Sequence, residues 1–248
     1  MILKKWMDPS WLSNSYLVGD HDGGTGLVVD TGADPAPLLQ AARDHRLQVT
    51  HIFNTHFHAD HTQYNRDIAS ATGAKVCIHR ADAPHLDGVG MELEGGERMN
   101  IGEMTVEVVH IPGHTAGQIL LILNGEDAFT GDTLFRRSIG GNRGPGGTTF
   151  ADLRRSIEKS ILTLPPSTRL RPGHTDPTTV AEELAENPFV RVMKGLDPEG
   201  EGECTFDGQQ ARLIVWGDDY DGGHKAWVRF PDGTDAVVPG SRTKVKRL

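Results

Sequence analysis

The sequence is short of cysteine, of basic charge and of long apolar runs, and each shortage excludes a class of protein. Its two cysteines, Cys77 and Cys204, lie far apart and form no CxxC or zinc-ribbon pattern, which argues against a disulfide scaffold and predicts free thiols. Its 25 basic residues are outnumbered by 34 acidic ones, and the net charge of −9 disfavours binding to nucleic acid. No apolar run approaches the roughly 18 residues that a membrane-spanning helix needs.

What remains is the composition of an ordinary globular protein. The 248 residues are 37% hydrophobic and 24% charged, which suits one large domain, or a domain of about 200 residues with a small appendage. The first residues reach Asp8 and Pro9 before any apolar run develops, so they do not resemble a signal peptide. We therefore expect a cytoplasmic protein that has neither a membrane nor a nucleic acid as its partner.

Residues 1–195 alternate short apolar runs with turn signals and amphipathic segments. Strands are expected over residues 14–20, 25–32, 49–56, 74–80, 104–113, 118–125, 126–135 and 168–174. Helices are expected over residues 34–47, 61–73, 150–165 and 178–189, the first capped by Asp34 and the last stopped near Pro188. Strands that come in runs and then alternate with helices predict a layered sheet covered by helices.

The composition changes after Phe189, which predicts a second unit. An acidic, glycine-rich segment is typical of a linker, and short strands separated by Asp-Gly turns follow it. We expect a main domain over residues 1–195 and a small β module over residues 204–248. The module's aromatic residues are expected to form its own core: Trp216, Tyr220, Trp227 and Phe230. About 45 residues barely stabilise themselves, so the module is expected to dock on the main domain or on a partner subunit.

The stretch "NTHFHADHT" concentrates good ligand side chains in very few residues. On an extended segment His56 and His58 point to the same side and can face one ion together. If the chain then turns into a helix, Asp60 and His61 swing toward a second position beside the first. Neutral imidazole and carboxylate both bind zinc and similar divalent ions.

Three further candidates follow strands elsewhere in the chain. His114 lies in "HIPGHTAGQ", Asp132 in "FTGDTLF" and His174 in "RPGHTDPTT". Each follows a β run and sits beside glycine, as expected for side chains that project from strand ends at one edge of a sheet. Seven candidate ligands in four such settings are hard to explain as surface or capping residues.

The order H-x-H-x-D-H, P-G-H-T, T-G-D and P-G-H resembles the metallo-β-lactamase-fold superfamily, over roughly residues 15–189. "GDTLFRRSIG" and "PGHTDPTTVAEELAENPF" look most like its glyoxalase II (hydroxyacylglutathione hydrolase) branch. The resemblance implies an α+β fold, a four-layer αββα sandwich, to which we add a small C-terminal β module of the SH3-like barrel type. It also implies two metal-ligand sets and a supporting residue: His56, His58 and His114; Asp60, His61 and His174; Asp132 bridging both; and Asp30 holding the metal loop.

The implied chemistry is hydrolysis of a small molecule. Two divalent ions, with zinc favoured and iron or manganese also suited, would lower the pKa of a bridging water and give hydroxide at neutral pH. Asp60 and Asp132 would be the catalytic carboxylates of such a centre. A thiolate leaves without a strong acid because a thiol has a pKa of about 8.5, so a thioester or another activated acyl compound is the expected substrate.

Three alternatives stay open. Persulfide dioxygenases share much of this pattern but use one iron, which would be held here by His56, His114 and Asp132. The β module could instead make the chain a docking or assembly protein, and it could join copies of the chain into a homo-oligomer. The glycine-rich loop "RRSIGGNRGPGGTT" either captures an anionic substrate group or is simply solvated; its candidates are Arg136, Arg137 and Arg143.

Overall fold

The computed structural model describes residues 1–246, so the last two residues of the expected β module lie outside the described part of the chain. The first half of the chain builds a six-stranded sheet in sequence order, antiparallel at its start and parallel from β3 onward. Its strands are β1 (Ile2–Met7), β2 (Asn14–Gly19), β3 (Thr25–Val29), β4 (Gln48–Phe53), β5 (Lys75–His79) and β6 (Val89–Leu93).

A second six-stranded sheet follows in the order β14-β13-β10-β9-β8-β7. Its strands are β7 (Arg98–Ile101), β8 (Met104–His110), β9 (Ile119–Leu123), β10 (Asp127–Gly131), β13 (Arg169–Pro172) and β14 (Thr178–Thr179). A two-stranded ribbon, β11 (Leu134–Phe135) and β12 (Ser138–Ile139), leaves this sheet after β10. The faces of the two sheets bury a common apolar cluster, in which Tyr16 meets Phe129 edge-on at 5.1 Å between ring centroids.

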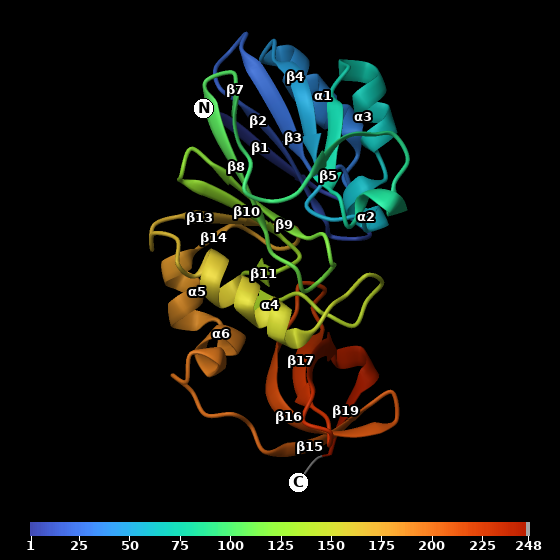
Figure 1. Cartoon of the computed structure of the whole chain (residues 1–248), viewed down its shortest axis with the longest axis vertical. Coiled ribbons are helices and arrows are strands. Elements are labelled where there is room, and N and C mark those ends of the chain that lie inside the picture. Colours follow the sequence, from blue (N-terminus) through green and yellow to red (C-terminus); the bar gives the residue numbers. More distant parts are fainter. Residues whose placement is uncertain (247–248) are drawn as a thin grey trace.

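Helices cover the outer faces of both sheets (Figure 1). On the first sheet these are α1 (Pro35–Asp44) and α3 (Asn65–Thr72), preceded by the short α2 (Ala59–Thr62). On the second they are α4 (Phe150–Ser156), α5 (Val180–Glu186) and α6 (Pro188–Met193). The predicted α+β sandwich with mixed sheets is therefore confirmed, and the fold needs both helical layers to bury the outer sheet faces.

Two of the expected helices differ in detail. The helix expected over residues 150–165 changes at Ile157 into a single π-helical turn, Ile157–Ile161. The helix expected to stop near Pro188 ends at Glu186, and Pro188 begins α6 instead. The Asn187 side chain accepts hydrogen bonds from the backbone N–H groups of the next helix's first turn, and proline suits that first turn because it has no N–H to satisfy.

The C-terminal strands form a third sheet, and it is open. Its five strands lie in the order β18-β17-β16-β15-β19: β15 (Gly202–Phe206), β16 (Gln209–Asp218), β17 (His224–Arg229), β18 (Asp235–Pro239) and β19 (Thr243–Val245). The expected SH3-like barrel is not confirmed, because β18 and β19 stand at opposite edges and no closed barrel is found within residues 1–246. One face of this open sheet packs against the rest of the molecule.

That covered face corrects part of a second expectation, that the aromatic residues of this segment form a core of their own. Phe230 does so, in an apolar cluster with Phe206 and Val238 of the same segment, but Trp227 does not. Trp227 is 1% exposed and packs against Phe150 of α4, with ring centroids 4.6 Å apart. Ile214, Val215 and Val237 join the same apolar cluster beside α4 and α6. The C-terminal sheet thus shares the core that covers the second main sheet (Figure 1).

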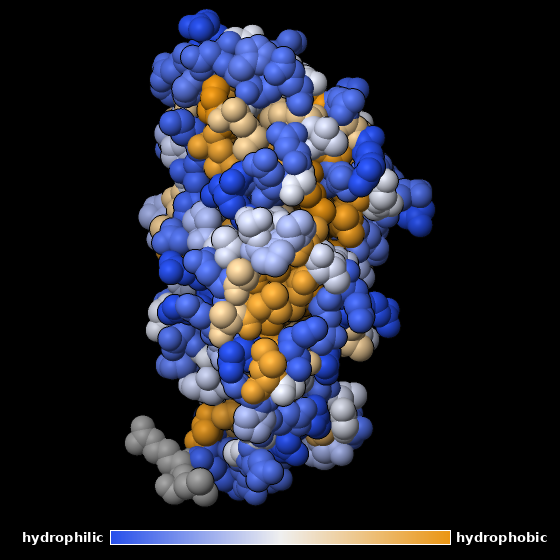
Figure 2. All heavy atoms as spheres, turned by 90° about the vertical axis from the view of Figure 1, so that its left-hand side faces the viewer, coloured by the Kyte–Doolittle hydropathy of each residue, from blue (hydrophilic) through white to orange (hydrophobic). Residues whose placement is uncertain are grey.

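The surface is mainly hydrophilic. On the face shown in Figure 2, apolar surface is visible in a band along the middle, between hydrophilic regions. The large apolar side chains most exposed in the described chain come from separate elements: Met1, Met7, Trp11, Leu196, Trp216 and Val245. Within residues 1–246, no helix has the length and apolar character that a membrane span requires.

Candidate metal centre

Seven side chains that the sequence singled out meet at one end of the two main sheets. They come from four places that each follow a strand: the segment from β4 into α2, the β8–β9 loop, and the turns after β10 and β13. Three overlapping groups have donor atoms that all lie within 4.8 Å of one another. The first group is His56, His58 and His114, the second group is Asp60, His61 and His174, and His56, His61 and Asp132 overlap both.

The first group consists of three imidazole rings whose inner nitrogens converge. His56 Nε2 and His114 Nε2 each lie 3.0 Å from His58 Nδ1. Two of the outer nitrogens contact the backbone, since His58 Nε2 lies 2.9 Å from the Pro145 carbonyl oxygen and His114 Nδ1 lies 2.7 Å from that of Gly141, and His56 Nδ1 lies 3.1 Å from the Thr55 hydroxyl oxygen. These outer contacts fix which nitrogen faces inward, an arrangement typical of metal-binding histidines.

The second group combines one carboxylate with two imidazole rings. Asp60 Oδ2 lies 3.4 Å from both His61 Nε2 and His174 Nε2. His174 Nδ1 lies 2.9 Å from the Leu12 carbonyl oxygen, so its orientation is also fixed. The short helix α2 carries Asp60 and His61, and the His61 ring also lies beside His56 of the first group, with centroids 4.3 Å apart.

Asp132 lies between the two groups. Its Oδ1 is 3.3 Å from His61 Nε2, while its Oδ2 is 3.3 Å from His174 Nε2 and 3.6 Å from His114 Nε2. A single carboxylate therefore reaches both groups. This is the position that the resemblance implied for a bridging ligand.

Asp30, the residue directly after β3, supports the centre through hydrogen bonds. Its carboxylate accepts hydrogen bonds from the Thr55 backbone N–H and hydroxyl group, both at 2.8 Å, and Oδ2 lies 2.9 Å from His61 Nδ1. Asp30 is 2% exposed and has a φ of 54°, a strained backbone conformation for a residue with a side chain. One buried carboxylate thus holds the start of the histidine segment and orients one ring of the second group.

The histidines of the centre differ in the direction in which their surroundings shift the pKa. Burial lowers the pKa of His56 well below its usual value and that of His114 to about 4, so both rings are neutral at pH 7. Burial also acts on His174, but the carboxylates of Asp132 and Asp60 outweigh it and raise the pKa of His174 to about 9. Burial alone would raise the pKa of Asp132, yet His174 and His61 hold it well below its usual value. The carboxylates therefore stay ionised and need positive charge beside them.

The donor set fits divalent cations. Three buried atoms at the centre have no hydrogen-bond partner within residues 1–246: His61 Nε2, His174 Nε2 and Asp132 Oδ1. Buried polar atoms are normally satisfied, and a cation among these atoms would satisfy all three. Imidazole and carboxylate are ligands that zinc, iron and manganese all accept. The described residues could therefore hold metal.

The backbone comes unusually close to the centre at Gly173. A Cβ atom at this position would lie 2.3 Å from Asp132 Oδ1 and 2.7 Å from His61 Cε1. Only glycine leaves room for both side chains, so it lets the turn after β13 bring His174 into the group.

The architecture and the centre agree with the sequence comparison. Residues 9–174 match the metallo-beta-lactamase superfamily. The chain belongs to this superfamily. The matched residues include all seven side chains of the centre and stop before the C-terminal sheet, which begins at β15.

One curated protein and two solved structures that are similar to this chain carry different names. The hydroxyacylglutathione hydrolase of Maricaulis maris is 32% identical over 219 residues, 73% of this chain and 84% of the relative. The crystal structure of ETHE1 from Myxococcus xanthus superposes with a TM-score of 0.69 at 28% identity, covering 79% of this chain and 92% of that one. The structure of TTHA1623 in a di-iron-bound form gives a TM-score of 0.65 at 30% identity, covering 75% and 99%.

The three arginines expected near the substrate have different surroundings. The Arg137 guanidinium forms an ion pair with Glu186, and that of Arg143 lies over the Phe230 ring, 5.3 Å from its centroid. Arg136 forms no ion pair with residues 1–246, and its backbone N–H donates to Thr175 Oγ1 at 3.3 Å, next to His174. Neither Arg136 nor Arg143 is part of an ion pair within residues 1–246, so both leave a positive charge for a substrate, and Arg136 is the one whose backbone contacts the turn after His174.

Sequence reasoning missed two residues that connect the C-terminal sheet with the centre, Tyr220 by direct contact and Asn142 through its neighbour Gly141. The Tyr220 ring, from the β16–β17 turn, stacks on His174 with centroids 3.9 Å apart. Asn142 exchanges hydrogen bonds with Val237 of β18 and is adjacent to Gly141, whose carbonyl oxygen holds His114. Neither residue belongs to a recognisable motif, and no local signal in the sequence connects the C-terminal segment with the centre.

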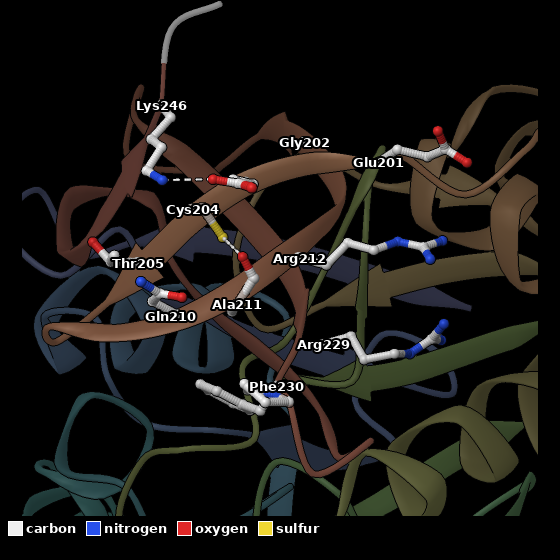
Figure 3. A pocket seen from close by; sticks show the side chains of 12 residues that line it. Glu201, Gly202, Cys204, Thr205, Gln210, Ala211, Arg212, Arg229, Phe230 and Lys246 are labelled. Atoms are coloured by element: carbon white, nitrogen blue, oxygen red, sulfur yellow. Dashed lines mark hydrogen bonds and ion pairs between the residues drawn. The ribbon is translucent and has the colours of Figure 1, made fainter.

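The C-terminal sheet also carries a cavity of about 390 Å³ outside the metal centre (Figure 3). Arg212 and Arg229 extend side by side along it, and both pair with Glu199. Burial raises the pKa of the Cys204 thiol in its wall, which keeps this sulfur protonated and a weak nucleophile. The cavity therefore presents no activated nucleophile of its own.

Proposed function

We propose that the chain is a metal-dependent hydrolase of a thioester or related activated acyl compound, similar to glyoxalase II. The position of Asp132 carries this proposal, because one carboxylate within 3.6 Å of three histidines from two groups suits a pair of cations. The similarity to hydroxyacylglutathione hydrolases at 32% identity supports the substrate class.

In this proposal His56, His58 and His114 hold one cation, Asp60, His61 and His174 hold the other, and Asp132 joins them. Zinc is favoured, and the di-iron form of TTHA1623 keeps iron open. Bound divalent cations would lower the pKa of water and polarise the acyl carbonyl group. The chain's own contribution is geometric: Asp30 and the backbone carbonyl groups of Gly141, Pro145 and Leu12 keep the rings oriented.

Metal analysis and a thioester assay on the purified, zinc-loaded protein test the proposal. We expect about two metal ions per chain and release of free thiol from acyl glutathione or a simpler thioester. His58→Ala should abolish the release and lower the metal content while the fold is kept. His21→Ala, an exposed histidine in the β2–β3 turn, is the matched control and should behave as wild type. Full thiol release by His58→Ala would refute the assignment.

A mononuclear iron persulfide dioxygenase is the second candidate, favoured by the structural similarity to ETHE1. It would use His56, His114 and Asp132 and would leave Asp60 without a metal. One iron per chain together with oxygen consumption on a glutathione persulfide would establish this alternative. Asp60→Asn separates the two, since it should halve the metal content of a two-metal enzyme and leave that of a one-iron enzyme unchanged.

A further inference from the structure

The C-terminal sheet reaches the metal centre through the tip of one hairpin. Tyr220 lies in the turn between β16 and β17, and its ring is nearly parallel to that of His174, at 12°. The same ring meets Phe135 of the β11–β12 ribbon edge-on, with centroids 5.6 Å apart. Tyr220 is therefore packed between a member of the second group and the ribbon that follows Asp132.

A buried ion pair holds this hairpin tip in place. Lys225 Nζ lies 2.9 Å from Asp219 Oδ2, and both side chains are less than a tenth exposed. The Lys225 ammonium group also lies 5.4 Å from the centroid of the Tyr220 ring. Pairing of this kind leaves the tyrosine few alternative positions, so its ring is a fixed surface rather than a mobile side chain.

A cavity of about 420 Å³ is lined by Tyr220, which stacks on His174, and by Thr175, which follows His174 in the chain. Its wall is formed by the turn after His174, the ribbon and the hairpin tip, which contribute Arg136, Arg137, Thr175, Asp176, Asp218, Asp219 and Tyr220. Three aspartates and two arginines give the wall a slight negative charge. Two of the aspartates and one arginine are already paired, with Lys5, Lys225 and Glu186.

We propose that the C-terminal sheet completes the substrate site: Tyr220 is the wall against which the non-reacting arm of the acyl substrate packs, and that arm is neutral or zwitterionic rather than polyanionic. This rests on the proposed hydrolase function and names the substrate class for the same centre. The half-buried Tyr220 side chain provides an apolar part of the cavity wall beside His174, and Arg136 leaves a positive charge for the arm. The exposed Asp218, 3.7 Å from His224 Nε2, provides a negative charge on the same wall. Arg136 is the one arginine of the wall without an ion pair among residues 1–246, too little positive charge for a polyanion, and the chain's net charge of −9 opposes one as well.

The test compares thioesters that carry one acyl group on three thiols: neutral N-acetylcysteamine, the zwitterionic peptide glutathione and polyanionic coenzyme A. For the wild type we expect the lowest KM with one of the first two. Tyr220→Ala should raise that KM about tenfold while kcat stays within about twofold. Tyr220→Phe retains the ring and should retain the KM. Trp216→Ala, an aromatic residue of the same hairpin that stacks on His224, is the matched control and should leave the KM unchanged.

Binding of a thioether analogue, in which a methylene group replaces the acyl carbonyl group, gives a second readout by calorimetry on the zinc-loaded proteins. Its Kd should rise about tenfold in Tyr220→Ala, with metal content and thermal midpoint close to wild type. If Tyr220 merely holds His174, the variant will instead lose metal or thermal stability without a change in KM or Kd, and the proposal is overturned. A preference for the coenzyme A thioester would also overturn it.

The outcomes separate this proposal from the hydrolase proposal. Turnover by the wild type with equal KM and Kd in Tyr220→Ala and Trp216→Ala overturns the role of Tyr220 alone. Binding of the analogue that depends on Tyr220, without turnover of any thioester, overturns the hydrolase proposal alone. A wild type that neither binds nor hydrolyses any of these compounds overturns both.

Discussion

Single residues decide the charge of the metal centre. Asp132 and Asp60 are ionised and partly or fully buried, and in the metal-free chain the positive charge that they need comes from protonated His61 and His174. A divalent cation would supply that charge instead, and the histidines would then have to be deprotonated to bind it. Protons and metal therefore compete for the same nitrogens.

This competition gives the metal-free protein a particular pH dependence. The pKa of His174 is raised from the ordinary value of about 6.5 to about 9, so its ion pairs stabilise the fold fully below pH 6.5 and are lost as the pH rises through 9. We expect the thermal midpoint of chelator-treated protein to fall between pH 6.5 and 9. The zinc-loaded protein should show no such fall, because the metal replaces the proton. Equal slopes in both forms would contradict this account.

A second prediction at the scale of one residue concerns Gly173. Gly173→Ala places a methyl group within 2.3 Å of Asp132 Oδ1, so either the carboxylate or the turn after β13 must shift. We expect a loss of one or both metal ions, measured by metal analysis, and a loss of thiol release. Gly144→Ala is the matched control, since a Cβ atom there would meet nothing within 4 Å. Normal metal content in Gly173→Ala would contradict this prediction, because it would mean that the turn after β13 shifts without loss of the metal ligands.

Whole elements explain what could be predicted from the sequence and what could not. The convergence of seven side chains was predictable because each follows a strand, and strand ends at one edge of a sandwich are neighbours. The π-helical turn after α4 and the contacts of Tyr220 and Asn142 were not predictable. The contacts of Tyr220 and Asn142 depend on how the C-terminal sheet packs on the main domain, which is a long-range property without a local pattern. The assignment of ligand roles and of residues 1–195 and 204–248 as separate domains stays a prediction.

The loop before α4 links the C-terminal sheet to the first group of histidines. Asn142 Oδ1 accepts from the Val237 N–H at 2.8 Å, and the neighbouring Gly141 carbonyl oxygen lies 2.7 Å from His114 Nδ1. Asn142→Ala leaves the buried Val237 N–H without this partner, at a cost of about 1–3 kcal/mol. We expect metal affinity to weaken by about 10-fold or more, as for other residues that orient metal ligands. Competition with a chromophoric chelator measures it, with Asn100→Ala in the exposed part of β7 as control.

At the scale of the whole molecule, the C-terminal sheet is part of the main core. Trp227, Ile214 and Val237 lie in one apolar cluster with α4 and α6, and the linker before β15 is tied down by Arg191–Asp197 and Arg229–Glu199 ion pairs. A docking module that binds partners would be expected to keep its main apolar face free. Here one face covers helices of the same chain, so assembly with other copies or partners stays a prediction that would have to use another surface.

Removal of the C-terminal sheet should therefore unfold the protein rather than free a partner-binding module. Deletion of residues 204–248 exposes the apolar cluster around Phe150, and we expect loss of soluble folded protein. Trp227→Ala is the graded version: it leaves a cavity beside Phe150 and should lower the free energy of unfolding by about 3–5 kcal/mol in denaturant titrations. Trp216→Ala, at 38% exposure, should cost far less. A truncated chain that remains folded and active would mean that the sheet is a separate module after all, and that the cluster is stable without it.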